Sequence, residues 1–326
     1  MSLEQHTPQS PIGTGFGART TAAETLTGVD LTGQLALVTG GYSGIGLETT
    51  RALSLAGVTV LVPARRPDSA REALAGIERV EVDELDLADL ASVESYAGRV
   101  QATGRPIDMV INSAGIMAAP ETRVGPGWES QFATNHLGHF ALINRLWPAI
   151  NAGGGGRVVA VSSGGHHRSP IRWDDVQFEH SYDKWAAYGQ AKTANALFAV
   201  RLDELGRGSG VRAFSLHPGG ILTPLQRHLP RAEMVAAGWI DGDGNPVNRS
   251  FKTPEQGAAT QVWAATSPQL EGMGGVYCVD CDIAPVTAKR EDGEGVNPWA
   301  CEPEQAARLW ALSAELTGVD AFARVA

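Results

Sequence analysis

Short, nearly continuous apolar runs recur along the chain and alternate with longer segments whose apolar residues follow a helical period. The runs lie at residues 35–39, 58–62, 79–84, 109–112, 157–162, 211–216 and 276–279. The helical segments lie at residues 45–56, 68–77, 90–101, 128–150, 184–205 and 254–265. Continuous apolar runs are typical of strands covered on both faces, and regular alternation with helices indicates a parallel sheet. The pattern predicts an α/β fold with a doubly wound sheet of about seven strands.

The alternation continues without a linker, so we predict one domain over residues 34–284. An N-terminal extension, residues 1–33, precedes it; we expect its start to be flexible and a short helix near residues 21–27. A C-terminal extension, residues 285–326, carries a further helix.

Two long irregular stretches, residues 164–183 and 219–253, follow the carboxyl ends of strands, where open α/β sheets bind ligands. The second stretch is rich in large apolar residues. We therefore predict a substrate lid at about 219–253, with a core-packing insertion or a subunit contact as the alternative.

Composition narrows the possible partners. Charged residues make up 19% and hydrophobic residues 43%, an ordinary globular balance, and the net charge is −10 without a block of Lys or Arg. This disfavours nucleic acid and anionic membranes as partners. No apolar run approaches the roughly 18 residues of a membrane span, and the N-terminus has no secretory pattern, so we expect a cytoplasmic protein.

Metal sites are not expected. Cys278 and Cys281 form a C-x-x-C pair, but residues three apart on a strand point to opposite faces, and no further ligands complete a zinc site. The pair His136 and His139 is read as packing or surface residues. The adjacent His166 and His167 are likewise not expected to bind a metal.

A glycine turn stands between the first strand and the first long helix. Gly40 permits a tight turn, Gly44 allows a pyrophosphate to approach the backbone, and Gly46 allows helix and strand to pack closely. The helix N-terminus then faces the phosphate charge. Strand, turn and helix together predict a nucleotide site, although a SAM-dependent methyltransferase can carry a similar turn.

Tyr188 and Lys192 are four residues apart in a predicted helix and therefore project from one face. A phenol normally titrates near pH 10, and a neighbouring ammonium favours its phenolate. The pair thus predicts proton transfer near neutral pH, for which a methyltransferase has no need.

The glycine turn and the Tyr-x-x-x-Lys pair together resemble the short-chain dehydrogenase/reductase family. The resemblance spans residues 35–279 and implies a Rossmann-type domain. The separation of 25 positions between Ser163 and Tyr188 and the sequence from Asn135 to Phe140 are similar to the retinol-dehydrogenase-like branch.

The resemblance implies four catalytic residues. Ser163 orients and polarises the carbonyl, Tyr188 is the general acid or base, Lys192 lowers the pKa of the tyrosine and holds the ribose, and Asn135 links Lys192 to water. It also implies a cofactor site. Its residues are Gly40, Tyr42, Ser43, Gly44, Ile45, Gly46, Arg65, Asp86, Leu87, Asn112, Ala114, Gly115, Tyr188, Lys192, Pro218, Gly219, Ile221 and Thr223. Asn112 is read as mainly structural, and Asp86 has the alternative role of a turn aspartate that caps the next helix.

The end of the second strand indicates which cofactor binds. Residues 63–67 contain no acid to bind a ribose 2′-hydroxyl, whereas the guanidinium of Arg65 suits a 2′-phosphate. We predict NADP, with NAD as second choice. Ser43 departs from the basic residue that many NADP-preferring relatives carry at this place.

The sequence therefore predicts an NADP(H)-dependent oxidoreductase that interconverts a ketone or aldehyde and an alcohol, on a hydrophobic small molecule. The resemblance implies transfer of the pro-S hydride. The alternative is a Rossmann-type protein that senses NADP without turnover. The choice between homodimer and homotetramer is left open.

Overall fold

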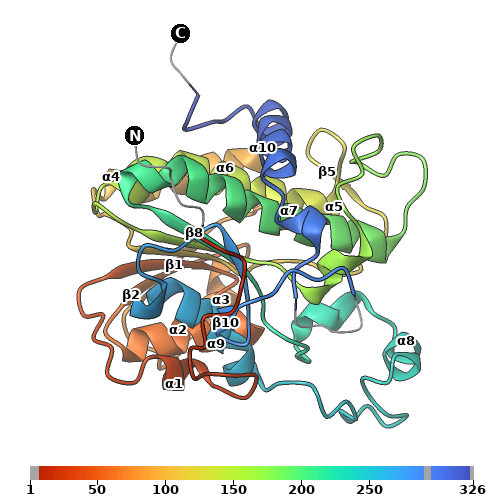
Figure 1. Cartoon of the computed structure of the whole chain (residues 1–326). Helices are drawn as coiled ribbons and strands as arrows, with labels where there is room; N and C mark the ends of the chain where they lie inside the picture. The colour runs from red at the N-terminus through yellow and green to blue at the C-terminus, as the bar shows by residue number, and fades with distance from the viewer. Residues whose placement is uncertain (1–6, 290–294, 324–326) are drawn as a thin grey trace.

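The computed structural model describes residues 7–289 and 295–323, and its centre is an eight-stranded sheet in the order β10-β9-β8-β7-β4-β1-β2-β3 (Figure 1). The strands are β1 (Leu35–Thr39), β2 (Thr59–Ala64), β3 (Val80–Glu84), β4 (Met109–Asn112), β7 (Arg157–Val161), β8 (Arg212–His217), β9 (Val276–Val279) and β10 (Asp282–Ile283). The first seven form parallel pairs, which confirms the predicted sheet. The eighth, β10, pairs antiparallel with β9 through a turn in which Asp280 and Cys281 have positive φ.

Helices cover both faces of the sheet. On one face lie α4 (Leu90–Ala102), α6 (Gly138–Asn151) and α7 (Lys184–Gly206), with α10 (Pro303–Thr317) packed outside them. On the other lie α2 (Gly44–Leu55), α3 (Pro67–Ala73) and α9 (Pro254–Thr266), with α1 (Ala22–Thr25) outside. In the described parts of the chain, no helix combines the length and the apolar character needed to cross a membrane.

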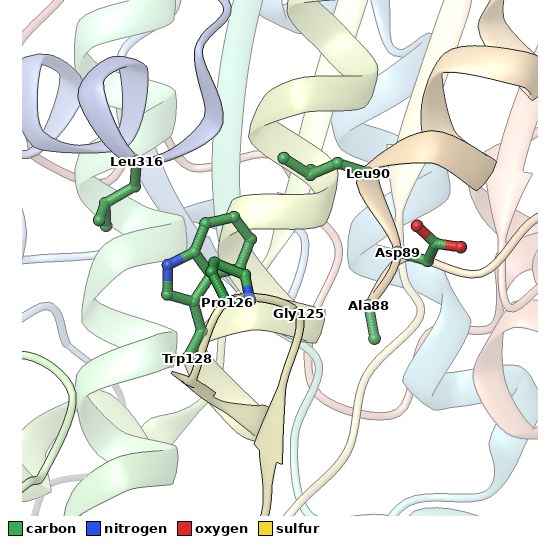
Figure 2. Close-up of a pocket in the computed structure, with 7 residues that line it drawn as sticks. All are labelled: Ala88, Asp89, Leu90, Gly125, Pro126, Trp128 and Leu316. Carbon is green, nitrogen blue, oxygen red and sulfur yellow. The ribbon is translucent and has the colours of Figure 1, made fainter.

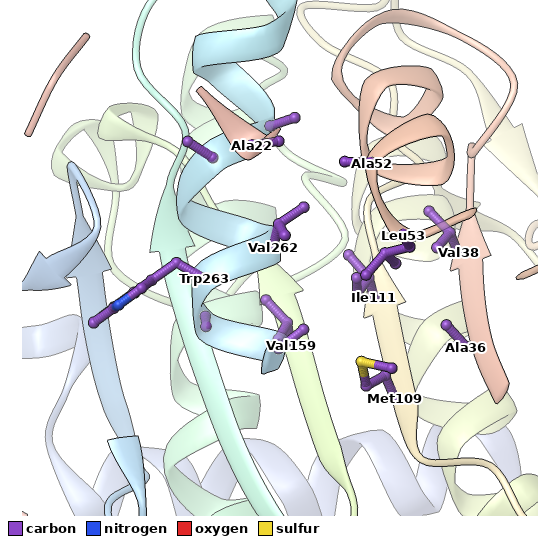
Figure 3. Packing of buried hydrophobic residues seen from close by; sticks show 14 of the residues in the cluster. Ala22, Ala36, Val38, Ala52, Leu53, Met109, Ile111, Val159, Val262 and Trp263 are labelled. Atoms are coloured by element: carbon purple, nitrogen blue, oxygen red, sulfur yellow. The ribbon is translucent and has the colours of Figure 1, made fainter. Parts of the chain in front are cut away.

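The core between the sheet and α2 and α9 is continuous. Figure 3 shows Leu53 of α2 beside Val38 of β1 and Ile111 of β4, and Val262 of α9 over Val159 of β7. All five side chains are fully buried. Truncating a buried leucine such as Leu53 to alanine typically costs about 2–5 kcal/mol, so this layer fixes the strand ends that carry the site.

The helix predicted over residues 128–150 is wrong at its start. Residues Trp128–Glu129 form β6, which pairs antiparallel with β5 (Arg123–Val124). The carboxylate of Glu129 then accepts hydrogen bonds from the amides of Gln131 and Phe132 and starts a short helix, α5 (Ser130–Phe132). A π-helical turn, Ala133–Leu137, precedes α6. The helix predicted over 68–77 also ends early, at Ala73.

Both extensions pack against the domain. The side-chain amide of Gln9 bonds the backbone of Tyr277 and Ala284, so the described part of the extension, from residue 7, is fixed to the sheet edge. The predicted flexible start includes residues 1–6, which lie outside the described residues. At the other end, Trp310 of α10 stacks on Phe198 of α7, with ring centroids 5.8 Å apart and planes 6° apart.

Candidate active site

The carboxyl ends of β1, β4, β7 and β8 open into a cleft of about 780 Å³. Of the residues predicted to bind the cofactor, those on the cleft wall are Gly40, Tyr42, Ser43, Gly44, Ile45, Gly46, Arg65, Asp86, Leu87, Ala114, Gly115, Tyr188, Lys192, Pro218, Gly219, Ile221 and Thr223. Ser163 lines the same cleft. Asn112 and Asn135 are buried behind the wall and do not line it.

The glycine turn after β1 forms a cradle that only glycine permits. Gly40 has φ +68°, and a Cβ on it would lie 3.0 Å from the Cα of Ala114. A Cβ on Gly46 would lie 2.3 Å from the carbonyl oxygen of Gly40. The turn is therefore packed against its own helix and against the residue Ala114 that follows β4, while the turn itself lines the cleft.

Tyr188 reaches the cleft from the N-terminal part of α7 and is held between Ser163 and a glycine. The side chain of Ser163 accepts a hydrogen bond from the amide of Gly165 at 3.0 Å, which orients its hydroxyl. A Cβ on Gly165 would lie 2.7 Å from the tyrosine ring, so the loop and the ring are in direct contact. Burial raises the pKa of Tyr188 to about 12, although a hydrogen bond with Ser163 and the charge of Arg168 lower it. The phenol is neutral at pH 7.

Lys192 lies one turn further along α7. Its ammonium donates to the carbonyl of Val161 at 2.9 Å and lies 5.6 Å from the centroid of the Tyr188 ring. Burial lowers the pKa of Lys192 to about 8, so the group is still mostly charged at pH 7. The influences that lower the Tyr188 pKa in this geometry are the hydrogen bond with Ser163 and the charge of Arg168. The effect of Lys192 on the tyrosine stays a prediction.

Asn135 is buried in the π-helical turn. Its side chain accepts from the amide of Ile116 at 2.8 Å and donates to the Ile116 carbonyl at 2.9 Å. A Cβ on Gly115 would lie 3.1 Å from the Asn135 amide oxygen and 3.7 Å from the Lys192 ammonium, so the three groups are neighbours. π-helical turns occur frequently at functional sites, because the extra residue re-aims one side chain.

His139 joins three parts of the site, a role that the sequence analysis missed. The hydroxyl of Thr39 accepts from the amides of Ser113 and Ala114, so its proton is donated to the His139 Nε2 at 2.8 Å. The other ring nitrogen, Nδ1, donates to the carbonyl of Asn135 at 2.9 Å. Burial lowers the pKa of His139 to about 4, and the neutral ring links the ends of β1 and β4 to the π turn.

His166 supports the backbone of the catalytic-serine candidate. Its Nε2 accepts from the amide of Asn297 at 3.0 Å, so Nδ1 carries the proton and donates to the carbonyl of Ser163 at 2.6 Å. The hydroxyl of Tyr277 donates to the same carbonyl at 3.2 Å. The C-terminal extension is thereby tied to the Ser163 loop. The adjacent histidines His166 and His167 are visible in the sequence as a feature of this loop. Asn297, the partner of His166, lies 131 residues further along the chain.

The C-x-x-C pair is buried at the far edge of the sheet. Cys278 lies in β9, and Cys281 follows in the turn with its thiol 3.8 Å from the hydroxyl of Thr260. Burial raises the pKa of both thiols, to about 12 for Cys281, so both are protonated at neutral pH.

The ends of β2 and β3 supply the wall beside the glycine turn. Arg65 and Arg66 are exposed there, and within residues 7–289 and 295–323 neither forms an ion pair with a carboxylate. Asp86 accepts from the amide of Ala88 at 2.9 Å and closes its own turn, whereas the helix cap of α4 is Asp89.

The predicted lid contains two short helices, η4 (Pro224–His228) and α8 (Arg231–Ala236). Its large apolar side chains gather over the mouth of the cleft around Tyr188; the members of this cluster are Met117, Ala118, Leu225, Leu229, Met234, Trp185 and Trp239. Glu233 of α8 pairs with Lys184 at 2.5 Å and accepts from the indole of Trp185 at 2.9 Å, which connects the lid to the start of α7.

A second hollow of about 370 Å³ lies between α4, the β5–β6 hairpin and α10 (Figure 2). It is lined by Ala88, Asp89, Leu90, Gly125, Pro126, Trp128 and Leu316. The carboxylate of Asp89 accepts from the amide of Ala91, and the other lining side chains are apolar. The candidate catalytic residues Ser163, Tyr188 and Lys192 line the larger cleft instead.

Comparison with known proteins places this geometry in a family. The sequence profile described as "short chain dehydrogenase" matches residues 34–234. A "Probable oxidoreductase" of Streptomyces lividans is 46% identical over 299 residues, covering 88% of this chain and 98% of that protein. "Retinol dehydrogenase 11" of Mus musculus is 34% identical over 297 residues, covering 89% and 88%. A crystal structure of a Mycobacterium paratuberculosis protein is similar with a TM-score of 0.69 and 32% identity, covering 90% of this chain and 96% of that one.

Proposed function

Because the chain belongs to the short-chain dehydrogenase family and is an oxidoreductase of that family, we propose that it interconverts a carbonyl and an alcohol on a hydrophobic small molecule with NADP(H). The observation that carries this proposal is the position of Ser163, Tyr188 and Lys192 on one cleft wall, beside the glycine cradle that follows β1. A proton donor and a nucleotide cradle then share one enclosed space.

The residues present fit a dinucleotide. The positions of Gly40 and Gly46 admit no side chain, which lets a pyrophosphate approach the backbone at the N-terminus of α2. When bound, the nicotinamide ring supplies or accepts the hydride. Ile221 and Thr223 also line the cleft, and the backbone at Ile221 and the hydroxyl of Thr223 are proposed to hold the carboxamide end, as the family resemblance implies.

Tyr188 is the residue proposed to transfer the proton. Its raised pKa keeps the phenol protonated at pH 7, which is the form that donates a proton to a carbonyl oxygen during reduction. Ser163 orients that oxygen by a hydrogen bond. Lys192 provides a nearby positive charge that stabilises the phenolate formed on proton transfer, and Asn135 is proposed to connect Lys192 to solvent.

The substrate is proposed to be apolar. The cluster around Tyr188 presents Met117, Leu225 and Trp239 to the carbonyl position. The similarity to a retinol dehydrogenase supports a lipid-like or polycyclic aldehyde, ketone or alcohol.

The cofactor preference gives the first test. Because Arg65 stands where an NAD-type acid would be, we expect wild-type kcat/KM to be higher with NADPH than with NADH. The Arg65→Ala variant should lose roughly tenfold with NADPH and little with NADH, since a charge-assisted bond to phosphate is worth about 1.5–3 kcal/mol.

Steady-state kinetics with a panel of hydrophobic carbonyls, followed as loss of absorbance at 340 nm, measures both ratios. A wild-type preference for NADH would contradict the cofactor assignment. Binding of NADPH without turnover of any carbonyl would favour the NADP-sensing alternative.

A further inference from the structure

Three arginines gather at the end of the cleft next to the glycine turn, and one of them comes from the lid. Arg65 and Arg66 follow β2, whereas Arg227 belongs to η4, more than 150 residues later in the chain. All three line the cleft together with Tyr42 and Ser43. No role for Arg227 follows from the motifs in the sequence.

The backbone holds η4 directly over the glycine turn. A Cβ on Gly44 would lie 3.2 Å from the side chain of Thr223, so the residue that starts η4 is in contact with the turn. Thr223 and Gln226 cap each other's backbone amides and fix this helical turn. Arg227 follows at once, and its guanidinium donates to the Pro224 carbonyl at 3.2 Å.

The three guanidinium groups form a concentration of positive charge. Within residues 7–289 and 295–323, none of them forms an ion pair with a carboxylate, although other arginines of the molecule do so. Burial and the charge of Arg65 lower the pKa of Arg227, while the neighbouring Tyr42 raises it. Neighbouring positive charges repel one another. An anion bound between two of the guanidinium groups would attract both and offset this repulsion.

We propose that Arg227 is the second arm of a phosphate clamp that, with Arg65, grips the 2′-phosphate of NADP(H) and thereby draws the lid over the cofactor. The inference rests on the proposed function, and it identifies Arg227 as the residue that couples cofactor binding to the position of the substrate lid. Arg227 approaches from η4 and Arg65 from the end of β2, so a dianionic phosphate between them can accept hydrogen bonds from both. The pyrophosphate, the other anionic group of the cofactor, occurs in both NADP and NAD. Ligands with and without the 2′-phosphate therefore separate the contribution of the 2′-phosphate from that of the pyrophosphate.

The test is calorimetric titration of the full chain with 2′,5′-ADP and with 5′-AMP, fragments that differ only in the 2′-phosphate and need no substrate. The variants are Arg227→Gln, Arg65→Gln and the double variant. The matched control is Arg249→Gln, an exposed lid arginine outside the cleft. We expect Arg227→Gln to weaken 2′,5′-ADP roughly tenfold and 5′-AMP less than twofold, and the double variant to lose less than the product of the two single losses.

Hydrogen exchange gives an independent readout. In the wild type, 2′,5′-ADP should slow exchange across residues 224–240, 5′-AMP should not, and Arg227→Gln should abolish the effect. Unchanged 2′,5′-ADP affinity in Arg227→Gln, or equal losses for both fragments, would overturn the clamp while leaving the proposed reaction intact. A wild type that binds both fragments equally would overturn the clamp together with the NADP preference.

Discussion

The two walls of the cleft are built differently. On the α7 side, every residue from 187 to 199 is buried, and side chains of this helix, among them Lys192 and Asn195, donate to the carbonyl of Val161. On the lid side, only Leu229 and Ile240 are buried among residues 222–250. The lid is connected to the start of α7 mainly through Glu233, whose ion pair with Lys184 is about one-third exposed.

We infer from this difference that the α7 wall holds the groups proposed for catalysis and that the lid wall sets the choice of substrate. The buried wall fixes Tyr188 by packing and by hydrogen bonds to the main chain, and moving it would expose core. Partly exposed ion pairs contribute only about 0.2–1 kcal/mol, so the pair of Glu233 with Lys184 adds little to the free energy that holds the lid in place. We therefore expect substitutions in the first wall to change rate or stability, and those in the second to change the choice of substrate.

The largest expected effect is on the buried wall. The Tyr188→Phe variant should lose two or more orders of magnitude in kcat, because general acid catalysis contributes about 10²–10⁴-fold, while NADPH binding stays nearly intact because the ring is kept. Stopped-flow or steady-state turnover, with a separate NADPH titration, measures both quantities.

Tyr182→Phe is the matched control, since that hydroxyl donates to the Ala119 carbonyl and has no ammonium one turn away. Near-normal turnover in Tyr188→Phe would remove the tyrosine from the mechanism.

Acid should destabilise the buried wall. Burial lowers the pKa of His136 to about 3 and that of His139 to about 4, whereas an unfolded histidine titrates near 6.5. As the pH falls below about 6.5, these histidines become protonated in the unfolded chain while their buried rings stay neutral in the native state. The free energy of unfolding therefore falls. At pH 5 the loss is about 2 kcal/mol for each such histidine.

Melting temperatures between pH 7.5 and 5 measure this loss. His136→Gln should lower Tm at pH 7.5 but flatten its slope against pH. His180→Gln is the control, because that side chain is 80% exposed and lies outside the core. Equal slopes in the wild type and His136→Gln would contradict the assignment.

The smallest expected effect is on the lid. Leu225→Ser or Trp239→Gln should raise KM for bulky hydrophobic carbonyls by roughly five- to tenfold, in line with the loss of one apolar contact, and change KM for small ones little. Tm should move by only a few degrees. Val247→Ser, an exposed lid position away from the cleft, is the control.

Hydrogen exchange in residues 219–253 should slow when cofactor and substrate bind. If these variants instead unfold the protein, or exchange is already slow without ligand, the segment is core or a subunit contact.

The parts of the site that were predictable are those encoded by neighbouring residues. The parallel strands and the glycine turn were predicted because continuous apolar runs and closely spaced glycines are local patterns. The π turn at Asn135 was not, because its residues have ordinary helical composition. His139 and Arg227 were missed because their neighbours in the site, Thr39 and Arg65, lie 100 or more residues away and are brought close only by the sheet.

The bond between Asn297 and His166 has a consequence for the order of synthesis. The ribosome completes every strand of the central sheet before residue 297 emerges, so the glycine cradle and α7 can form while the loop of Ser163 still lacks one anchor. The same holds for α10, which follows every strand of the sheet in the chain and packs on α7. A chain released before residue 297 would keep the bonds from His166 and Tyr277 to the Ser163 carbonyl but would lack the bond that fixes the His166 ring, and we expect lower activity from it.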